Sequence, residues 1–236
     1  MHAQAPSTAA KNNPRGLAVA HGTGRRASNN IAAVSSVQRK APGETLFAEG
    51  DEAASVYEVV RGMVRLYKML PDGRRQITGF LSAGHLLGLA SEGHCLYSAE
   101  AVTEVALCRY ERRAFERMID EVPGFARRLL TVASDELRAA QDQMLLLGRK
   151  TATEKVASFL LMIADQQDCD DADQLDVPMT RSDIADHLGL TIETVSRTLT
   201  KLKQDGLIAL PAPTRIEIRH RNQLERLAAG EADTDL

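Results

Sequence analysis

The most specific chemical pattern in this chain is a set of polar side chains spaced for one face of a helix. Glu193 and Arg197 are four residues apart, and Ser196 falls on the same face. In the major groove of DNA, an arginine donates to O6 and N7 of guanine, and a glutamate accepts from the N4 amino group of cytosine. A serine hydroxyl bonds to a base or to a phosphate. The pattern therefore predicts a helix that reads base edges.

Two neighbouring residues extend this predicted face. Ile192 is placed to contact a thymine methyl group, and Lys201 is placed to contact a phosphate. The alternative for Glu193 and Arg197 is an ordinary ion pair on a solvated helix, worth only about 0.3–0.5 kcal/mol. The two roles are compatible, because such a pair would hold Arg197 in the rotamer that reaches a base.

Two short helices around a tight turn must position these side chains. Thr180 and Thr191 are the predicted N-caps, with Asp183 three residues after the first, and Gly189 suits the left-handed residue of the turn. Small and apolar residues fall where the helices must bury a shared face: Ile184, Ala185, Leu188, Leu190, Val195 and Leu199. Residues 180–202 are therefore a predicted helix-turn-helix. Its candidate DNA-binding residues are Thr180, Thr191, Ile192, Glu193, Ser196, Arg197 and Lys201.

Charge is distributed unevenly along the chain. The formal net charge of −3 gives no overall support for a nucleic-acid partner. Residues 196–226, however, carry seven Lys or Arg against three acids, so basic surface is predicted on and after the second helix of the motif. Residues 165–176 carry six Asp and no base, but they lack the glycine and terminal glutamate of a calcium-binding loop. We expect this segment to be a solvated connector.

Composition narrows the class of protein. The 236 residues are 44% hydrophobic and 26% charged, as in ordinary globular proteins. Aromatic residues make up 4% without Trp, which argues against stacking platforms for single-stranded nucleic acid. Cys95, Cys108 and Cys169 form no even set, so a disulfide framework is not expected. Because no apolar run approaches the roughly 20 residues of a spanning helix, we predict a cytoplasmic protein with no membrane partner.

The N-terminal half divides into two predicted regions. Residues 1–40 carry six Lys or Arg, no acid and no sustained periodicity, and are predicted to be a flexible tail. Across residues 41–120, glycines recur every 11 or 12 positions between short apolar runs, with a turn at Arg61-Gly62 and a hairpin at Pro71-Asp72-Gly73. This texture predicts an antiparallel β-roll that ends in a short helix.

A long helix is predicted over residues 121–148, ending at a hinge near Gly148. Small and large apolar residues alternate along it at spacings of 4, 3, 4, 3, 4 and 3: Ala126, Leu130, Ala133, Leu137, Ala140, Met144 and Leu147. A seam over three heptads is typical of a self-associating helix, so we predict a homodimer. The alternative is a helix buried in its own domain, and Leu129 and Val132 are placed to pack back onto the strands.

Residues 149–236 are predicted to form a winged-helix domain. Its first helix would bury Val156, Phe159, Leu160 and Ile163. After the helix-turn-helix, LIAL and RIEIRH are predicted to form the hairpin of a wing, and about fifteen C-terminal residues to be weakly structured. The predicted fold class is therefore α+β: an antiparallel β-roll, a long dimerisation helix and a C-terminal winged helix-turn-helix.

Three motifs carry a resemblance to a known family. IETVSRTLTKLKQDGLI resembles the CRP/FNR superfamily of bacterial transcription regulators, and LLLGRKTATEKVASFLL and QITGFLSAGHLLGL resemble its FNR and FixK branches. The resemblance implies a homodimer on a palindrome with TTGAT-type half-sites, with Glu193, Ser196 and Arg197 at the base-reading positions. It also implies activation through RNA polymerase, with a contact surface around Asp72 and Gly73.

Departures from the family bear on ligands. The cyclic-AMP branch carries Gly-Glu-Leu and an Arg-Ser pair, where this chain has Gly84-His85-Leu86 and Tyr97-Ser98. Without the arginine, a cyclic phosphodiester loses its charge-assisted partner. Residues 1–94 contain no cysteine, so the iron–sulfur cluster of the FNR branch cannot be assembled. The remaining resemblance is to FixK-like regulators, which implies control of oxygen-limited respiration or nitrogen metabolism without a cofactor.

Two alternatives remain at the level of sequence. The first is a haem- or gas-sensing regulator of the same superfamily, with His85 or His94 as an axial ligand. The second is a metal-dependent cupin-like enzyme that uses the same two histidines. Such an enzyme site normally needs a third histidine and a carboxylate, and residues 41–110 contain no other histidine. We therefore expect a regulator and not an enzyme.

Overall fold

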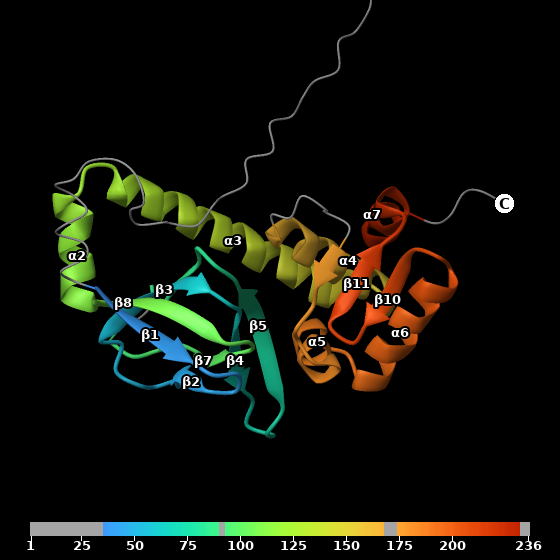
Figure 1. Ribbon diagram of the computed structural model, residues 1–236, viewed down its shortest axis with the longest axis horizontal. Helices are drawn as coiled ribbons and strands as arrows, with labels where there is room; N and C mark the ends of the chain where they lie inside the picture. The colour runs from blue at the N-terminus through green and yellow to red at the C-terminus, as the bar shows by residue number, and fades with distance from the viewer. Residues whose placement is uncertain (1–34, 90–92, 168–173, 232–236) are drawn as a thin grey trace, which may run out of the picture.

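The computed structural model describes residues 35–89, 93–167 and 174–231. Figure 1 shows a β-rich N-terminal domain and a mixed C-terminal domain, with one long helix running past both. The element order, strands followed by a long helix and then a helix-turn-helix with a small sheet, agrees with the predicted α+β architecture.

Two antiparallel sheets of four strands each form the N-terminal domain, which we call the roll. The first sheet has the order β1 (Ser35–Lys40), β8 (Val105–Glu111), β3 (Ser55–Arg61) and β6 (Leu86–Leu87). The second has the order β2 (Thr45–Phe47), β7 (Ser98–Ala101), β4 (Val64–Met69) and β5 (Arg75–Leu81). β5 is an edge strand, and it lies on the side of the roll that faces the C-terminal domain (Figure 1).

Apolar side chains from both sheets fill the roll. Val59, Val64 and Leu107 are fully buried. Among them, the ring of Phe47 stacks on Tyr57 with centroids 5.9 Å apart and lies 5.8 Å from the ring of Tyr97. These contacts bury the alternating residues that predicted the strands.

The last six residues of the predicted flexible tail form a strand. Residues 35–40 form β1, which pairs with β8 from Ser35 opposite Tyr110 to Lys40 opposite Val105. The segment SSVQRK offers little apolar alternation, and Val37 remains 69% exposed. The strand is therefore held by backbone pairing with β8, which a local pattern does not reveal. Residues 1–34 lie outside the described part of the chain.

The turns of the roll combine one predicted hairpin with one change of sheet. β4 and β5 pair directly through the turn that contains Asp72 and Gly73, as predicted. β3 and β4, by contrast, belong to different sheets, so the turn at Gly62 carries the chain from one sheet to the other. Gly62 has φ +89°, and a Cβ there would lie 2.2 Å from the carbonyl oxygen of Glu104. Only glycine fits this crossing.

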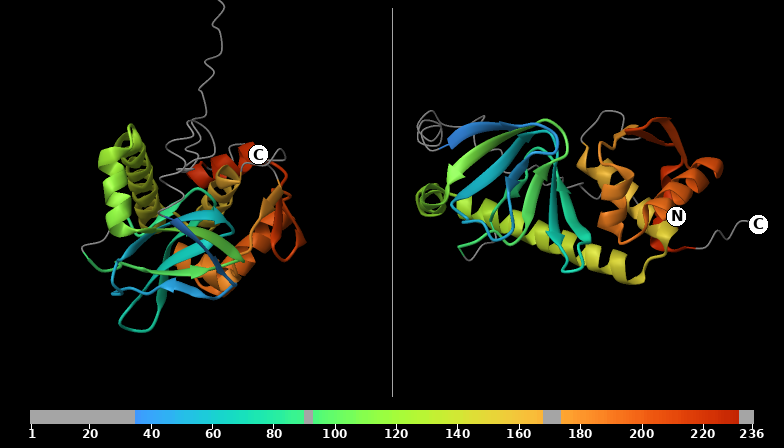
Figure 2. Two further views of the ribbon diagram at one scale, coloured as in Figure 1. Left: turned by 60° about the vertical axis from the view of Figure 1, so that its left-hand side comes forward. Right: turned by 90° about the horizontal axis from the view of Figure 1, so that it is seen from below.

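Two helices follow the roll: α2 (Arg112–Glu121) and α3 (Phe125–Arg149). Further views show α3 running along one side of the roll to the C-terminal domain (Figure 2). Leu129 and Val132 pack against a cluster that contains Phe115 and Phe125, as predicted. α3 ends at Arg149, one residue beyond the predicted end at Gly148, and the chain becomes extended at Lys150.

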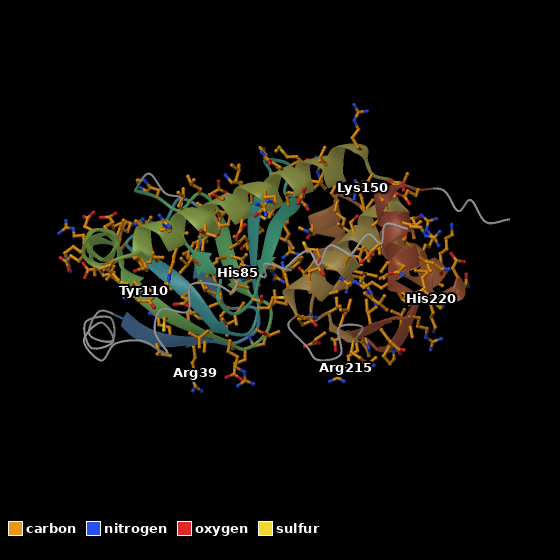
Figure 3. The ribbon with its side chains drawn as sticks, turned by 90° about the horizontal axis from the view of Figure 1, so that it is seen from above. Arg39, His85, Tyr110, Lys150, Arg215 and His220 are labelled. Carbon is orange, nitrogen blue, oxygen red and sulfur yellow. The ribbon has the colours of Figure 1, made fainter. Side chains whose placement is uncertain are left out.

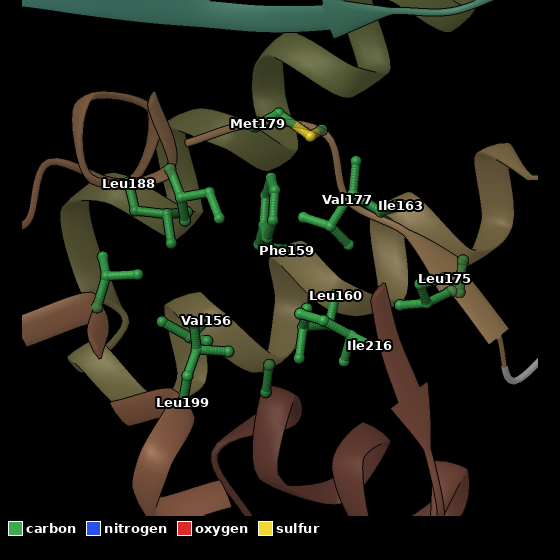
Figure 4. Packing of buried hydrophobic residues seen from close by; sticks show 14 of the residues in the cluster. Val156, Phe159, Leu160, Ile163, Leu175, Val177, Met179, Leu188, Leu199 and Ile216 are labelled. Carbon is green, nitrogen blue, oxygen red and sulfur yellow. The ribbon is translucent and has the colours of Figure 1, made fainter. Parts of the chain in front are cut away.

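The C-terminal domain begins with α4 (Ala152–Gln166), which a capping box between Thr151 and Glu154 opens. The helix-turn-helix follows as α5 (Arg181–Leu188) and α6 (Ile192–Gln204). The residues predicted for the buried face of α4 are all at most 1% exposed and form the centre of the core in Figure 4: Val156, Phe159, Leu160 and Ile163.

The end of the domain contains more structure than predicted. The wing is a three-stranded sheet in the order β10 (Ile208–Ala212), β11 (Arg215–Ile218) and β9 (Gln174–Asp176), so its third strand comes from the predicted connector. Residues 168–173 of that connector, including Cys169, lie outside the described residues. The predicted weakly structured end instead holds α7 (Arg221–Ala229), whose Leu224 and Ala228 are buried and which contacts α4.

Roll and C-terminal domain share one hydrophobic core. Met63, Ile77 and Phe80 of the roll belong to the same buried cluster as the core of the winged helix. The C-terminal domain is therefore packed onto the roll as well as being joined to it through α3.

Candidate DNA-binding face

Local signals shape the helix-turn-helix as predicted. The hydroxyl of Thr180 accepts from the backbone N–H of Asp183 at 3.1 Å, and the Asp183 carboxylate accepts from the backbone N–H of Thr180 at 3.1 Å. At the turn, Gly189 adopts φ 60°, and Thr191 then caps α6 by accepting from the N–H of Thr194 at 3.2 Å. Each cap satisfies backbone donors that a helix start leaves free.

The buried face that joins the two helices is the one the sequence predicts. Ile184, Leu188, Val195 and Leu199 are at most 2% exposed. Ala185 is buried where α5 meets the rest of the domain, and Leu190 is partly buried against the same cluster. These contacts fix the direction of α6 relative to α5.

The polar residues predicted to read DNA lie together on the exposed side of α6. Ile192, Glu193, Ser196, Arg197 and Lys201 are all exposed. Among the described residues, Glu193 and Arg197 make no ion-pair contact within 4 Å. The backbone N–H at the start of α6, the Thr191 hydroxyl and the charge of Arg197 lower the pKa of Glu193, which keeps its carboxylate ionised as an acceptor.

Hydroxyl groups on and before α6 are partly used inside the protein. Ser196 donates its hydroxyl proton to the carbonyl oxygen of Ile192 at 2.8 Å, which leaves its lone pairs as acceptors. Thr180 donates to Asp183 at 2.8 Å, at the start of α5 and apart from the face on α6. Of the candidate DNA-binding residues, Thr180 and Thr191 thus act as helix caps, and the others form one exposed face.

Two further basic residues of the C-terminal domain follow this face in the sequence and are exposed. Lys203 is exposed near the end of α6, and Arg215 is exposed at the start of β11. Figure 3 shows Arg215 and His220 on the C-terminal domain, away from His85 in the roll. Ammonium and guanidinium groups in such places suit phosphates.

The predicted dimerisation seam is largely exposed in this single chain. Leu130, Leu137 and Met144 are 69%, 62% and 66% exposed, and the alanines of the seam at positions 126, 133 and 140 are exposed as well. Leu147, at the end of the seam, is instead partly buried in the C-terminal core, with Cδ2 3.5 Å from where a Cβ on Gly189 would lie. One apolar stripe thus runs along α3 and is left uncovered by the described part of the chain.

The two residues that replace the Arg-Ser pair of the cyclic-AMP branch make hydrogen bonds inside the roll. Where the cyclic-AMP branch has an arginine and a serine, Ser98 is buried and accepts from the backbone N–H of Glu49 at 2.9 Å. The Tyr97 hydroxyl accepts from the N–H of Gly88 at 3.1 Å, and burial raises the pKa of this phenol. Neither side chain supplies the positive charge that a phosphodiester needs.

Neither histidine of the roll belongs to a cluster of metal-ligating side chains among the described residues. No group of three or more His, Cys, Asp or Glu is arranged there to hold a metal ion. Nδ1 of His85 lies 3.0 Å from the carbonyl oxygen of Ser82, while His94 is exposed. Burial lowers the pKa of His85, which keeps that ring neutral.

No helix of the described residues has both the length and the apolar character needed to span a bilayer.

Sequence reasoning missed a second set of residues around the helix-turn-helix. Asp183 was expected only as a cap, yet it also pairs with Arg65 and Arg75 of the roll. His187 is 2% exposed on the inner face of α5. A histidine and an aspartate among the apolar positions of a short helix are the only local signal of this contact.

Comparison with known proteins agrees with this geometry. A family model described as a Crp-like helix-turn-helix domain matches residues 154–227, and one described as a cyclic nucleotide-binding domain matches residues 37–122. The second match identifies the fold of the roll, whose residues nevertheless depart from the nucleotide-binding pattern.

Individual relatives agree over most of the chain. The chain is 49% identical over 170 residues to the nitrogen fixation regulation protein FixK of Bradyrhizobium diazoefficiens. The aligned region covers 71% of this chain and 72% of that protein. It is 42% identical over 217 residues to the transcriptional activatory protein AadR of Rhodopseudomonas palustris, covering 91% and 90%. The solved structure of FixK2 from Bradyrhizobium japonicum matches with a TM-score of 0.78 at 39% identity, covering 82% of this chain and 97% of that chain.

Fold, reading face and relatives converge on one assignment. The two family models together span the roll and the winged helix, and the relatives extend across the helix that joins them. The chain belongs to the CRP/FNR family of transcription regulators, in its FixK-like branch, and is a DNA-binding regulator and not an enzyme.

Proposed function

We propose that the protein is a homodimeric activator that binds a palindrome with TTGAT-type half-sites through α6. The observation that carries this proposal is the exposed row of Glu193, Ser196 and Arg197 on a capped helix. Arg197 would donate to a guanine and Glu193 would accept from a cytosine. Ile192 would contact a thymine methyl, and Lys201 would contact a phosphate.

The apolar stripe on α3 supports the dimer. Its seven positions, 126, 130, 133, 137, 140, 144 and 147, follow the heptad spacing, and three of its large side chains are more than 60% exposed. Pairing two copies of α3 would bury them and would set two copies of α6 about a twofold axis. A two-fold protein recognises a palindromic operator.

Residues of the roll and the cysteine count support activity without cyclic AMP and without an iron–sulfur cluster. Ser98 and Tyr97 are engaged by backbone groups, and the residue before Ser98 in the sequence is Tyr97 where the cyclic-AMP branch has an arginine. The chain holds three cysteines, one fewer than a four-thiolate cluster requires. We infer that the protein binds DNA in the absence of a small effector.

Target genes and polymerase contact are inferred from the relatives and the hairpin. FixK is named as a regulator of nitrogen fixation, which favours genes of nitrogen metabolism or oxygen-limited respiration in the cytoplasm of a bacterium. The turn of the β4–β5 hairpin presents Asp72 and Gly73, with the Asp72 side chain 51% exposed. This turn is the proposed contact with RNA polymerase.

A mobility-shift assay tests the proposal. Purified protein is incubated with a TTGAT palindrome, a single half-site and unrelated DNA, with and without air and cyclic AMP. We expect tight binding to the palindrome alone, unchanged by air or cyclic AMP. Binding that requires cyclic AMP or is lost in air would contradict effector independence, and a Soret band in the protein's absorbance spectrum would indicate haem.

A further inference from the structure

A partly buried group of charges, centred on the buried Asp183, ties the roll to the helix-turn-helix. Oδ1 of Asp183 accepts from Nη1 of Arg65 at 3.0 Å and from Nη2 of Arg75 at 2.6 Å. Nε of Arg75 donates to Asp186 at 2.9 Å, and Arg65 also pairs with Glu100. Arg65 lies on β4 and Arg75 on β5, whereas both aspartates lie on α5. We call this group the α5 clamp.

Asp183 has two tasks in this arrangement. Its side chain is 2% exposed, so the charge must be satisfied by protein groups. Oδ1 accepts from the two arginines, while Oδ2 accepts from the backbone N–H and the hydroxyl of Thr180. The same carboxylate therefore caps α5 and docks it on the roll.

Polar contacts at the other end of α5 also attach this helix to β5 and to α3. Nδ1 of His187 lies 3.1 Å from the carbonyl oxygen of Ile77 on β5, and its ring lies 5.3 Å from the ring of Phe80. The carbonyl oxygen of His187 accepts from Gln143 of α3 at 2.9 Å. α5 is thus bound along its length to β5 and to the helix that carries the apolar stripe.

The clamp leaves the reading face open. α5 contacts β5 on one side and α6 on the other, and α6 lies on the outer side of the C-terminal domain (Figure 1). Glu193, Ser196 and Arg197 are exposed, and none belongs to the clamp. A contact that masked DNA binding would cover these side chains.

We propose that Arg65 and Arg75 are positioning residues for DNA recognition, which hold α5 so that α6 has a fixed angle to α3 without a bound effector. Two directional ion pairs prevent the sliding that the apolar contact of Ile77 and Phe80 alone would permit. The inference rests on the proposed homodimer, in which the angle of each α6 sets the distance between the two reading helices.

Energetics agree with a positioning role. Burying charges is costly, and a buried ion pair is often no more stabilising than apolar residues of the same size. Nε of Arg65 is buried without a hydrogen-bond partner, which adds to that cost. Burial alone would lower the pKa of Arg75, but Asp186 and Asp183 outweigh it and raise the pKa, so the guanidinium stays charged. The α5 clamp therefore fixes the orientation of α5 more than it adds to the free energy of unfolding.

The test uses the full-length dimer and measures its preference for half-site spacing. Arg75→Gln removes the charge that meets both aspartates, and Arg75→Lys keeps the charge but loses the two-pronged geometry. Arg74→Gln is the matched control, because Arg74 pairs only with Asp72 in the exposed hairpin. Affinity is measured for the palindrome at its preferred spacing, for spacings one base pair longer and shorter, and for a half-site.

We expect Arg75→Gln to weaken binding at the preferred spacing by about tenfold, to flatten the preference among spacings and to leave half-site affinity unchanged. Arg75→Lys should fall between Arg75→Gln and the wild type, and Arg74→Gln should match the wild type. An Arg75→Gln protein that keeps the wild-type spacing preference, or that binds the palindrome more tightly, would overturn the clamp. A wild-type protein that binds half-site and palindrome equally would instead overturn the proposed function.

Discussion

The guanidinium of Arg75 lies 2.6 Å from the carboxylate of Asp183, across a sequence separation of 108 residues. Through this pair, an edge strand of the roll reaches the first turn of the helix-turn-helix. The family fold supplies two domains and a connecting helix, and this contact makes them one packed unit. The reading helix is therefore placed by the roll as well as by the chain that leads into it.

Replacing the glycine at the turn of the helix-turn-helix should destabilise the protein, whereas replacing the glycine near the end of α3 should not. Gly189→Ala places a Cβ on a residue with φ 60°, which costs about 1–2 kcal/mol of unfolding free energy. Gly148→Ala is the matched control, because Gly148 is helical with nothing within 4 Å of a new Cβ, and it should stabilise α3 by about 0.5–1 kcal/mol. Urea unfolding measures both, and equal effects of the two changes would contradict the assigned turn.

The contact between α5 and β5 should weaken in acid. Burial against Ile77 and the neighbouring rings lowers the pKa of His187 from 6.5 to about 4. The unfolded chain therefore takes up this proton at a higher pH than the folded chain. The contribution of neutral His187 to the free energy of unfolding should be fully present above about pH 6.5. The free energy of unfolding should then fall by up to about 3 kcal/mol as the pH drops to about 4.

The measurement is the pH dependence of urea unfolding for wild type and His187→Leu. Arg75, Asp183 and Asp186, the charged groups that β5 and α5 contribute around this contact, remain in both proteins. Their effects are common to the two proteins, so the difference isolates the histidine. The variant should lose the extra slope between about pH 6.5 and 4, and identical slopes would show that His187 does not titrate as described.

The stripe on α3 should be required for dimer formation. Leu137→Glu places a charge at the middle of the seam, so it should yield monomers and abolish binding to the palindrome. Leu145→Glu is the control, because Leu145 is equally exposed at 62% but lies outside the heptad positions. Sedimentation velocity gives the assembly state. A dimeric Leu137→Glu protein, or a monomeric Leu145→Glu protein, would place the interface elsewhere.

Local signals made the helix-turn-helix predictable from the sequence. Thr180, Gly189 and Thr191 each act within a few residues of their position, and their roles in the structure are the ones that their types indicate. The seam on α3 is likewise a property of spacing along one helix, although its pairing stays a prediction. Helix caps and left-handed glycines depend on residues only a few positions away, so their roles can be predicted without knowing how the domains pack.

Elements held by distant partners were missed. β1 has few apolar residues and owes its place to β8, and α7 owes its place to the contact of Leu224 and Ala228 with α4. The clamp is the clearest case, since Asp183 and His187 among the apolar positions of α5 indicate a polar contact but do not indicate that two arginines of the roll share the Asp183 carboxylate. Such pairings depend on the packing of whole domains, which no local pattern encodes.

The central claim is that Arg197 reads a base, and anisotropy titrations of Arg197→Ala test it most directly. The DNAs are the TTGAT palindrome, the same palindrome with each guanine replaced, and unrelated DNA, with Lys201→Ala as the phosphate-contact control. Arg197→Ala should lose about 1–3 kcal/mol on the palindrome and no longer discriminate at the guanine, whereas Lys201→Ala should weaken all DNAs alike. An Arg197→Ala protein that loses the same affinity on every DNA, and still prefers guanine, would contradict the account.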